Sequence, residues 1–214
     1  MTTSSDIIED LVVDLKPVRP GWVARRLAIG LIPGALAVAA FVVALWGTRP
    51  DLVPAMAGWA FWAKLGFTGI LALIGLASVV GLARPDRDAG YGVLGAACAI
   101  IAMTVLALVQ YGFAPEAARR TLLFGATART CPWLIMALSI PILMGGLVGL
   151  RSLAPTRLAS AGAALGLLSG AGAATIYAFS CDEAGMPFVL IWYGLGIAAP
   201  TVLGALLGPR LLGW

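Results

Sequence analysis

The sequence predicts an all-α integral membrane protein, with six transmembrane helices preceded by a short N-terminal cytoplasmic amphipathic helix. Of its 214 residues, 61% are hydrophobic and only 11% are charged. A soluble domain would carry about a quarter charged residues. Six apolar stretches are each long enough to cross a hydrocarbon core of roughly 30 Å. Because the chain before the first stretch is polar and acidic, we expect two parts: a cytoplasmic segment, 1–22, and a transmembrane domain, 23–214.

The N-terminal segment is predicted to form an acidic, amphipathic helix over residues 6–18. Its apolar residues recur at three- and four-residue spacing and form one stripe: Ile7, Ile8, Leu11, Val12, Leu15 and Val18. Four carboxylates occupy the remaining surface, those of Asp6, Glu9, Asp10 and Asp14. Such a stripe suits a hydrophobic groove on a protein partner. The alternatives are that the helix packs on the protein's own loops or that it lies on the bilayer surface. Membrane-surface helices usually carry Lys and Arg, so the acidic face disfavours the bilayer.

The six spans are expected near residues 27–46, 64–82, 92–111, 132–150, 158–179 and 187–207, with loops between them. Nine Lys and Arg residues fall on the side of the N-terminus and five on the other. This bias predicts that both termini are cytoplasmic. Glycines four residues apart favour close packing of the fifth and sixth spans in lipid, namely Gly162, Gly166, Gly170, Gly204 and Gly208.

Composition and missing motifs exclude several classes of function. The chain has no histidine, which removes His-ligated haem, His-containing zinc sites and histidine acid–base chemistry. No cofactor and no enzymatic activity are expected, and the net charge of +4 lies in flanking loops and gives no case for direct nucleic-acid binding. A small inner-membrane transporter or metal exporter is the alternative function, although no acidic residue lies within a span. A membrane thiol oxidoreductase would need a second redox pair.

Two of the three cysteines are predicted to lie at the outer face. Cys131 opens the fourth span and Cys181 follows the fifth. Our hypothesis is a pair that responds to oxidation or to a metal, and the alternatives are a permanent disulfide or two unrelated thiols. Asp182 and Glu183 would supply oxygen ligands to such a metal. Cys98, in mid-span among Ala and Ile, is expected to be a packing residue.

Lys64 is the one basic residue at the head of a span. Its neighbours Trp59 and Trp62 place it near the outer interface, so its side chain is expected to extend toward the headgroups. The alternative is a charge partner for Asp182 or Glu183, which would gather an outer-face cluster around the cysteines.

The chain resembles the NrsF-type membrane anti-sigma factors of proteobacteria, which have six spans. The resemblance rests on short motifs along nearly the whole chain: Asp14 to Val18, Phe61-Trp62 with Lys64, Cys131-Pro132-Trp133, Leu138-Ser139, Pro141, Leu150-Arg151, Ala154-Pro155, Tyr177, Cys181, Trp192 to Gly196, and Gly208 to Leu212. One departure is Ser180, which stands where histidine is common in the family, and it weakens the case for a His-assisted metal site.

The resemblance implies a bacterial inner-membrane protein that regulates transcription. In this family the N-terminal segment holds an extracytoplasmic-function sigma factor at the membrane. The resemblance further implies that Cys131 and Cys181 take part in sensing oxidative or heavy-metal stress. An acidic, apolar-striped helix agrees with such a partner, because sigma factors carry basic helical surfaces.

Overall fold

The protein is a bundle of membrane-spanning helices. The computed structural model describes residues 21–83, 90–153 and 155–213. Within these ranges every regular element is a helix, and six spans are long and apolar enough to cross a membrane. The spans are α2 (Trp22–Leu45), α4 (Trp59–Leu82), α5 (Gly90–Phe113), α7 (Cys131–Arg151), α8 (Leu158–Tyr177) and a composite of α9 (Met186–Phe188), a π-helix (Val189–Tyr193) and α10 (Gly194–Leu211).

The structure confirms the six expected spans, and their ends differ from the expected ones by up to five residues. Two short helices were not predicted: α3 (Leu52–Ala57) and α6 (Glu116–Phe124) lie in segments that we expected to be loops. Isolated helices this short are marginal in water, so their formation depends on packing that the local sequence does not reveal. The expected N-terminal helix, 6–18, lies outside the described residues.

Helix α8 forms the centre of the bundle and packs against α10, α4 and α7. Its side chains are mostly Ala and Gly, which allow neighbouring backbones to approach closely. A methyl group on Gly162 would collide with the carbonyl oxygen of Gly204, and one on Gly166 with that of Pro200. These contacts confirm the packing predicted from the four-residue glycine spacing.

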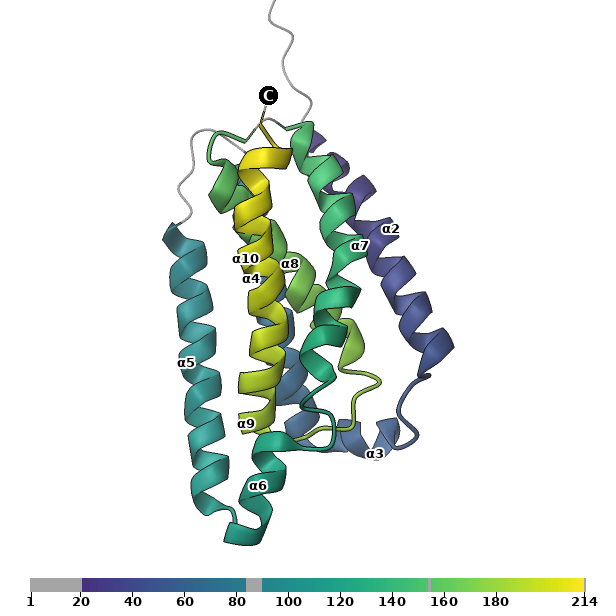
Figure 1. Cartoon of the computed structure of the whole chain (residues 1–214), viewed down its shortest axis with the longest axis vertical. Coiled ribbons are helices and arrows are strands. Elements are labelled where there is room, and N and C mark those ends of the chain that lie inside the picture. The colour runs from purple at the N-terminus through teal and green to yellow at the C-terminus, as the bar shows by residue number, and fades with distance from the viewer. Residues whose placement is uncertain (1–20, 84–89, 154, 214) are drawn as a thin grey trace, which may run out of the picture.

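Helices α2 and α5 lie at opposite outer edges of the bundle (Figure 1). Helix α2 packs mainly on α7, while α5 packs on α4 and, at one end, on the short helix α9. Cys98 lies on α5 and is exposed, so the expectation that it is a packing residue was wrong for the described part of the bundle. The error arises because α5 has few neighbours, which leaves most of its surface free.

The two ends of the bundle differ in structure. One end holds the start of α2 and the end of α10, and we call it the terminal end. The opposite end, which we call the cysteine end, carries α3, α6 and the residues Cys131 and Cys181. The tryptophans Trp46, Trp59, Trp62 and Trp133 are exposed near the cysteine end, and Trp22 is exposed at the terminal end. This arrangement matches aromatic belts at two membrane interfaces.

Candidate functional site

Cys131 and Cys181 are neighbours, although 50 residues separate them in the sequence. Cys131 is the first residue of α7, and Cys181 follows α8, its backbone N–H donating to the Tyr177 carbonyl at 3.1 Å. Both are free thiols in this structure and both are buried, with exposed fractions of 0% and 3%. The two thiols lie close enough for Cys131 to lower the pKa of Cys181. The expectation that the two spans bring these thiols to one place is therefore met.

Lys64 lies beneath the loop that carries Cys181. Its ammonium group donates to the carbonyl oxygens of Cys181 at 2.8 Å and Glu183 at 2.9 Å, and only 1% of the residue is exposed. The expectation that Lys64 extends to the membrane surface was wrong, because α4 begins five residues earlier and the loop after α8 covers the side chain. Its hydrogen-bond partners are backbone carbonyls, whereas the alternative expectation named the carboxylates of Asp182 or Glu183.

Two tyrosines close the site from α8 and the π-helix. The rings of Tyr177 and Tyr193 stack with centroids 6.2 Å apart, and the Lys64 ammonium lies 5.7 Å from the Tyr193 ring centroid. Tyr193 is fully buried, and its hydroxyl faces the Cys181 sulfur without a well-formed hydrogen bond to any described residue. Both tyrosines belong to the motifs of the resemblance, yet their meeting at the thiols depends on the packing of helices distant in sequence.

Glu183 connects the loop after α8 to the turn before α7. Its Oε1 accepts hydrogen bonds from the backbone N–H of Ala126 at 2.7 Å and of Thr127 at 3.2 Å, and from the Thr127 hydroxyl at 3.2 Å. Gly125 has a φ of +49° and lies so close to this carboxylate that a Cβ would collide with it. The carboxylate therefore holds together the two segments that carry the cysteines.

Asp182 points away from the thiols. Its carboxylate lies 3.5 Å from the Arg49 guanidinium, which also binds Asp51 at 2.6 Å and donates to the Cys181 carbonyl at 3.4 Å. This contact with Arg49 lowers the pKa of Asp51. Since Asp182 and Glu183 are engaged elsewhere, the donor set facing a metal at this site would be two sulfurs. Across the described ranges, no group of three or more Cys, Asp or Glu side chains is gathered for a metal.

The surroundings favour a charged Cys181. The neighbouring Cys131 lowers the pKa of the Cys181 thiol to about 6, and the Lys64 ammonium acts in the same direction against the opposing effect of burial. A thiolate is both the nucleophilic and the metal-binding form of cysteine. This arrangement thus presents one activated sulfur beside a second thiol, and a two-electron oxidant would be needed to join them as a disulfide.

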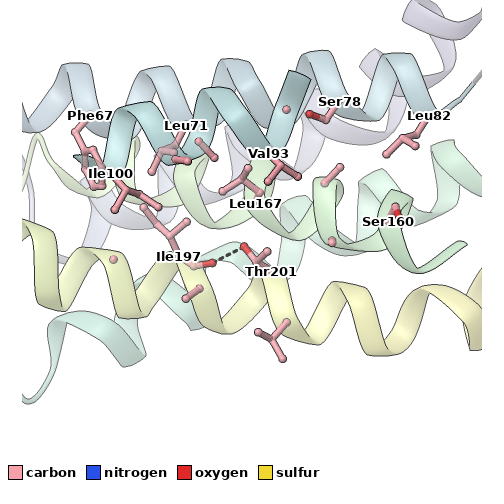
Figure 2. Close-up of a pocket in the computed structure, with 18 of the residues that line it drawn as sticks. Phe67, Leu71, Ser78, Leu82, Val93, Ile100, Ser160, Leu167, Ile197 and Thr201 are labelled. Carbon is pink, nitrogen blue, oxygen red and sulfur yellow. Dashed lines mark hydrogen bonds between the residues drawn. The ribbon is translucent and has the colours of Figure 1, made fainter. Parts of the chain in front are cut away.

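A separate groove lies between α5 and the rest of the bundle and has a volume of about 720 Å³ (Figure 2). Its walls come from α4, α5, α8 and α10 and are mostly apolar, with Phe67 and Ile197 among the labelled residues. The hydroxyl groups of Ser78 and Thr201 bond to carbonyl oxygens of their own helices. The groove therefore suits acyl chains and offers little to a hydrophilic solute.

Comparison with known proteins agrees with this architecture. A family model described as "Negative regulator of sigma F", NrsF, matches residues 11–214. The chain belongs to this family. A probable anti-sigma-F factor NrsF of Azospira oryzae is 36% identical over 211 residues, and an anti-sigma-F factor NrsF of Caulobacter vibrioides is 36% identical over 216 residues. Each alignment covers 99% of this chain and 99% of the relative. No solved structure matches the chain.

Membership of the NrsF family assigns the chain a regulatory role, which confirms the class expected from the sequence. The residues predicted to bind the partner lie outside the described part of the chain: Ile7, Ile8, Glu9, Asp10, Leu11, Asp14, Leu15 and Val18. The predicted sensing residues Cys131 and Cys181 lie together, with Lys64 and Glu183 around them. Asp182 lies apart from the sulfurs.

Proposed function

We propose that this NrsF-family protein holds an extracytoplasmic-function sigma factor at the bacterial inner membrane and releases it when the cysteine site changes. One observation carries the proposal: a buried pair of free thiols lies at one end of the bundle, and α2, which continues the N-terminal segment, begins at the other. A reactive group on one side of a membrane and a binding segment on the other are the two parts that a transmembrane sensor needs.

In this proposal the terminal end faces the cytoplasm and the cysteine end faces the periplasm. The excess of Lys and Arg on the side of the N-terminus supports this orientation. It places residues 1–22 where a sigma factor is available, and it places the thiols in a compartment that permits their oxidation.

The acidic, amphipathic helix predicted over residues 6–18 would bind the sigma factor. Its apolar stripe provides the anchor and its four carboxylates complement a basic partner surface. Binding there would occlude a surface that the sigma factor needs for the polymerase or for promoter DNA, so the bound factor is inactive.

The signal would act by joining the two sulfurs of Cys131 and Cys181. They would be joined as a disulfide when a two-electron oxidant in the periplasm takes the electrons and the two thiol protons leave, or through a soft metal ion that displaces those protons. Both events consume the free thiol pair and pull the start of α7 toward the loop after α8. Lys64 and Glu183 hold that loop, so the change alters contacts that fix the cysteine end.

Helix α7 offers a direct route from the thiols to the N-terminal segment. It begins at Cys131, crosses the bundle and packs along α2, whose first residue is Trp22. A methyl group on Gly30 would collide with the backbone of Gly145, and one on Gly34 with that of Pro141. Such backbone contact makes a shift of α7 difficult to absorb without a shift of α2.

The partner-binding part of the proposal is tested by Leu11→Asp or Leu15→Asp in the full-length protein. Each places a charge in the apolar stripe, so we expect release of the sigma factor and a rise in expression of a reporter gene that depends on it. Val13→Asp is the matched control, because Val13 lies off the stripe. The prediction fails if reporter expression is unchanged in cells whose membranes contain normal amounts of the Leu11→Asp or Leu15→Asp protein. That result would remove this helix from the mechanism.

A further inference from the structure

A second cavity lies at the cysteine end, between α6 and the turn that leads into α7, and has a volume of about 570 Å³. Two Arg–Thr pairs line it: Arg120 and Thr121 from α6, and Arg129 and Thr130 from the turn. Both arginines are exposed, and among the described residues neither takes part in a hydrogen bond or an ion pair. The cavity therefore gathers two positive charges that no carboxylate in the described part of the chain neutralises.

Part of the cavity wall is aromatic and is held in place by tertiary contacts. Trp192 of the π-helix donates its indole N–H to the Leu123 carbonyl at 2.8 Å, and its ring centroid lies 6.3 Å from that of Phe124. Both aromatic residues line the cavity, and 53% of Phe124 is exposed. The cavity thus places an apolar surface beside two cationic groups, which is the combination that an amphiphilic anion requires.

Two acidic residues lie near the cavity, and neither pairs with its arginines. Glu116 is one helical turn before Arg120 on α6, yet no ion pair joins them in the described part of the chain. Glu183 does not line the cavity, and its carboxylate accepts hydrogen bonds from the backbone N–H groups of Ala126 and Thr127. Positive charge therefore predominates on the cavity wall.

The cavity lies at the membrane interface of the cysteine end. Thr130 immediately precedes α7 and stands three residues before Trp133, a helix rise of about 4.5 Å. Trp133 is exposed and is one of the tryptophans that mark the interface at this end. Helix α6 lies at the same end of the bundle (Figure 1), and its two arginines are followed by an apolar run, Leu122 to Phe124. Cationic groups at this depth meet phospholipid head groups.

We propose that this cavity binds the phosphate head group of an anionic phospholipid in the leaflet at the cysteine end. The planar guanidinium groups of Arg120 and Arg129 match phosphate oxygens with pairs of N–H donors. A zwitterionic lipid would bring its own cation against the two arginines, so the site favours a head group with net negative charge. Phe124 and Trp192 would pack against the first carbons of an acyl chain. The inference goes beyond the proposed function and requires neither the sigma factor nor a reaction of the thiols.

A bound phosphate would also brace the turn that leads into Cys131. It would join Arg120 on α6 to Arg129 in the turn, while the Glu183 carboxylate already holds the same turn through two backbone N–H groups. In nanodiscs that contain phosphatidylglycerol, we expect hydrogen exchange of the amides of residues 125–130 to be at least about threefold slower than in phosphatidylcholine alone. Equal rates in the two lipids would count against a phosphate bound between α6 and the turn.

The direct test is native mass spectrometry of the purified full-length protein, titrated with phosphatidylglycerol or with phosphatidylcholine of the same acyl chains. We expect the first phosphatidylglycerol to bind at least about tenfold more tightly than phosphatidylcholine. Arg120→Gln and Arg129→Gln should each weaken phosphatidylglycerol binding by about tenfold or more, because each removes charge-assisted hydrogen bonds to the phosphate. Both side chains are exposed, so neither substitution is expected to disturb the fold.

Arg119→Gln is the matched control, because it removes the same charge from the same helix. Its guanidinium carbon lies 5.4 Å from the Tyr111 ring centroid, and it does not line the cavity. We expect this variant to change phosphatidylglycerol binding by at most about twofold. Similar weakening by all three variants, or equal binding of the two lipids by the wild-type protein, overturns the proposal. Glycerol phosphate supplies the phosphate without acyl chains, and if it binds as tightly as phosphatidylglycerol, a soluble anion is the ligand and the lipid assignment is wrong.

Discussion

At the scale of single residues, the cysteine site is organised by side chains whose partners are distant in sequence. Lys64 binds carbonyl oxygens more than one hundred residues away, and Glu183 binds the turn that precedes Cys131. Both residues are recognisable in the sequence as charges near a membrane interface. Their partners are not, because the loop after α8 folds back over the start of α4 only when the whole bundle has formed.

Glu183→Ala tests this connection. Loss of the carboxylate leaves the N–H groups of Ala126 and Thr127 without their acceptor, so the turn before α7 should lose about 1–3 kcal/mol of local stability. Hydrogen exchange of these two amides should accelerate by roughly 5- to 150-fold. Asp182→Ala is the control, because among the described residues the ion pair with Arg49 is the one contact found for its exposed carboxylate. Equal exchange rates in the two variants would contradict the assigned role of Glu183.

At the scale of elements, glycine decides which helices contact through their backbones. The contact of α8 with α10 follows from the regular spacing of Gly162, Gly166 and Gly170, which is visible in the sequence. The contact of α2 with α7 uses the same four-residue spacing, in Gly30 and Gly34 on α2 and in Gly145 and Gly149 on α7, but only the structure shows that these two helices face each other. In lipid, where apolar surfaces gain little from meeting one another, such close approaches set the helix arrangement.

Gly30→Ala tests whether α2 and α7 move together. Alanine improves helix propensity by about 1 kcal/mol, yet its methyl group would collide with the backbone of Gly145 and push the helices apart. We expect a smaller induction of the sigma-dependent reporter when cells are treated with an oxidant or a soft metal. Gly69→Ala on α4 is the control, because a methyl group there meets open space. Equal induction in both variants, at equal protein levels, would remove the α2–α7 contact from signal transmission.

At the scale of the whole molecule, the bundle separates two chemistries across the thickness of a membrane. The cysteine end holds the buried thiols with Lys64, and the terminal end holds the beginning of α2 together with Arg25, Arg26, Arg151, Arg157 and Arg210. Helices α7 and α2 pack along each other between these two ends. The proposed function therefore requires that the terminal end faces the cytoplasm and the cysteine end faces the periplasm.

Fusions of reporter proteins test that orientation. Green fluorescent protein joined after the last residue should fluoresce, because it folds well only on the cytoplasmic side, and alkaline phosphatase at the same position should be inactive. Phosphatase inserted in the segment between α2 and α3 should be active. The reverse pattern would place the thiols in the cytoplasm and contradict the proposed mechanism.

The sequence by itself determined the class of the protein, its six spans and the packing of α8 on α10. These depend on hydropathy and on spacing within one segment, which are local properties of the chain. Only the tertiary structure decided that Lys64 is buried, that its partners are carbonyl oxygens, that Tyr193 closes the site and that α2 pairs with α7. Each of these depends on which distant surfaces meet, and in a bilayer that choice follows from the shape complementarity of whole helices, which no single segment encodes.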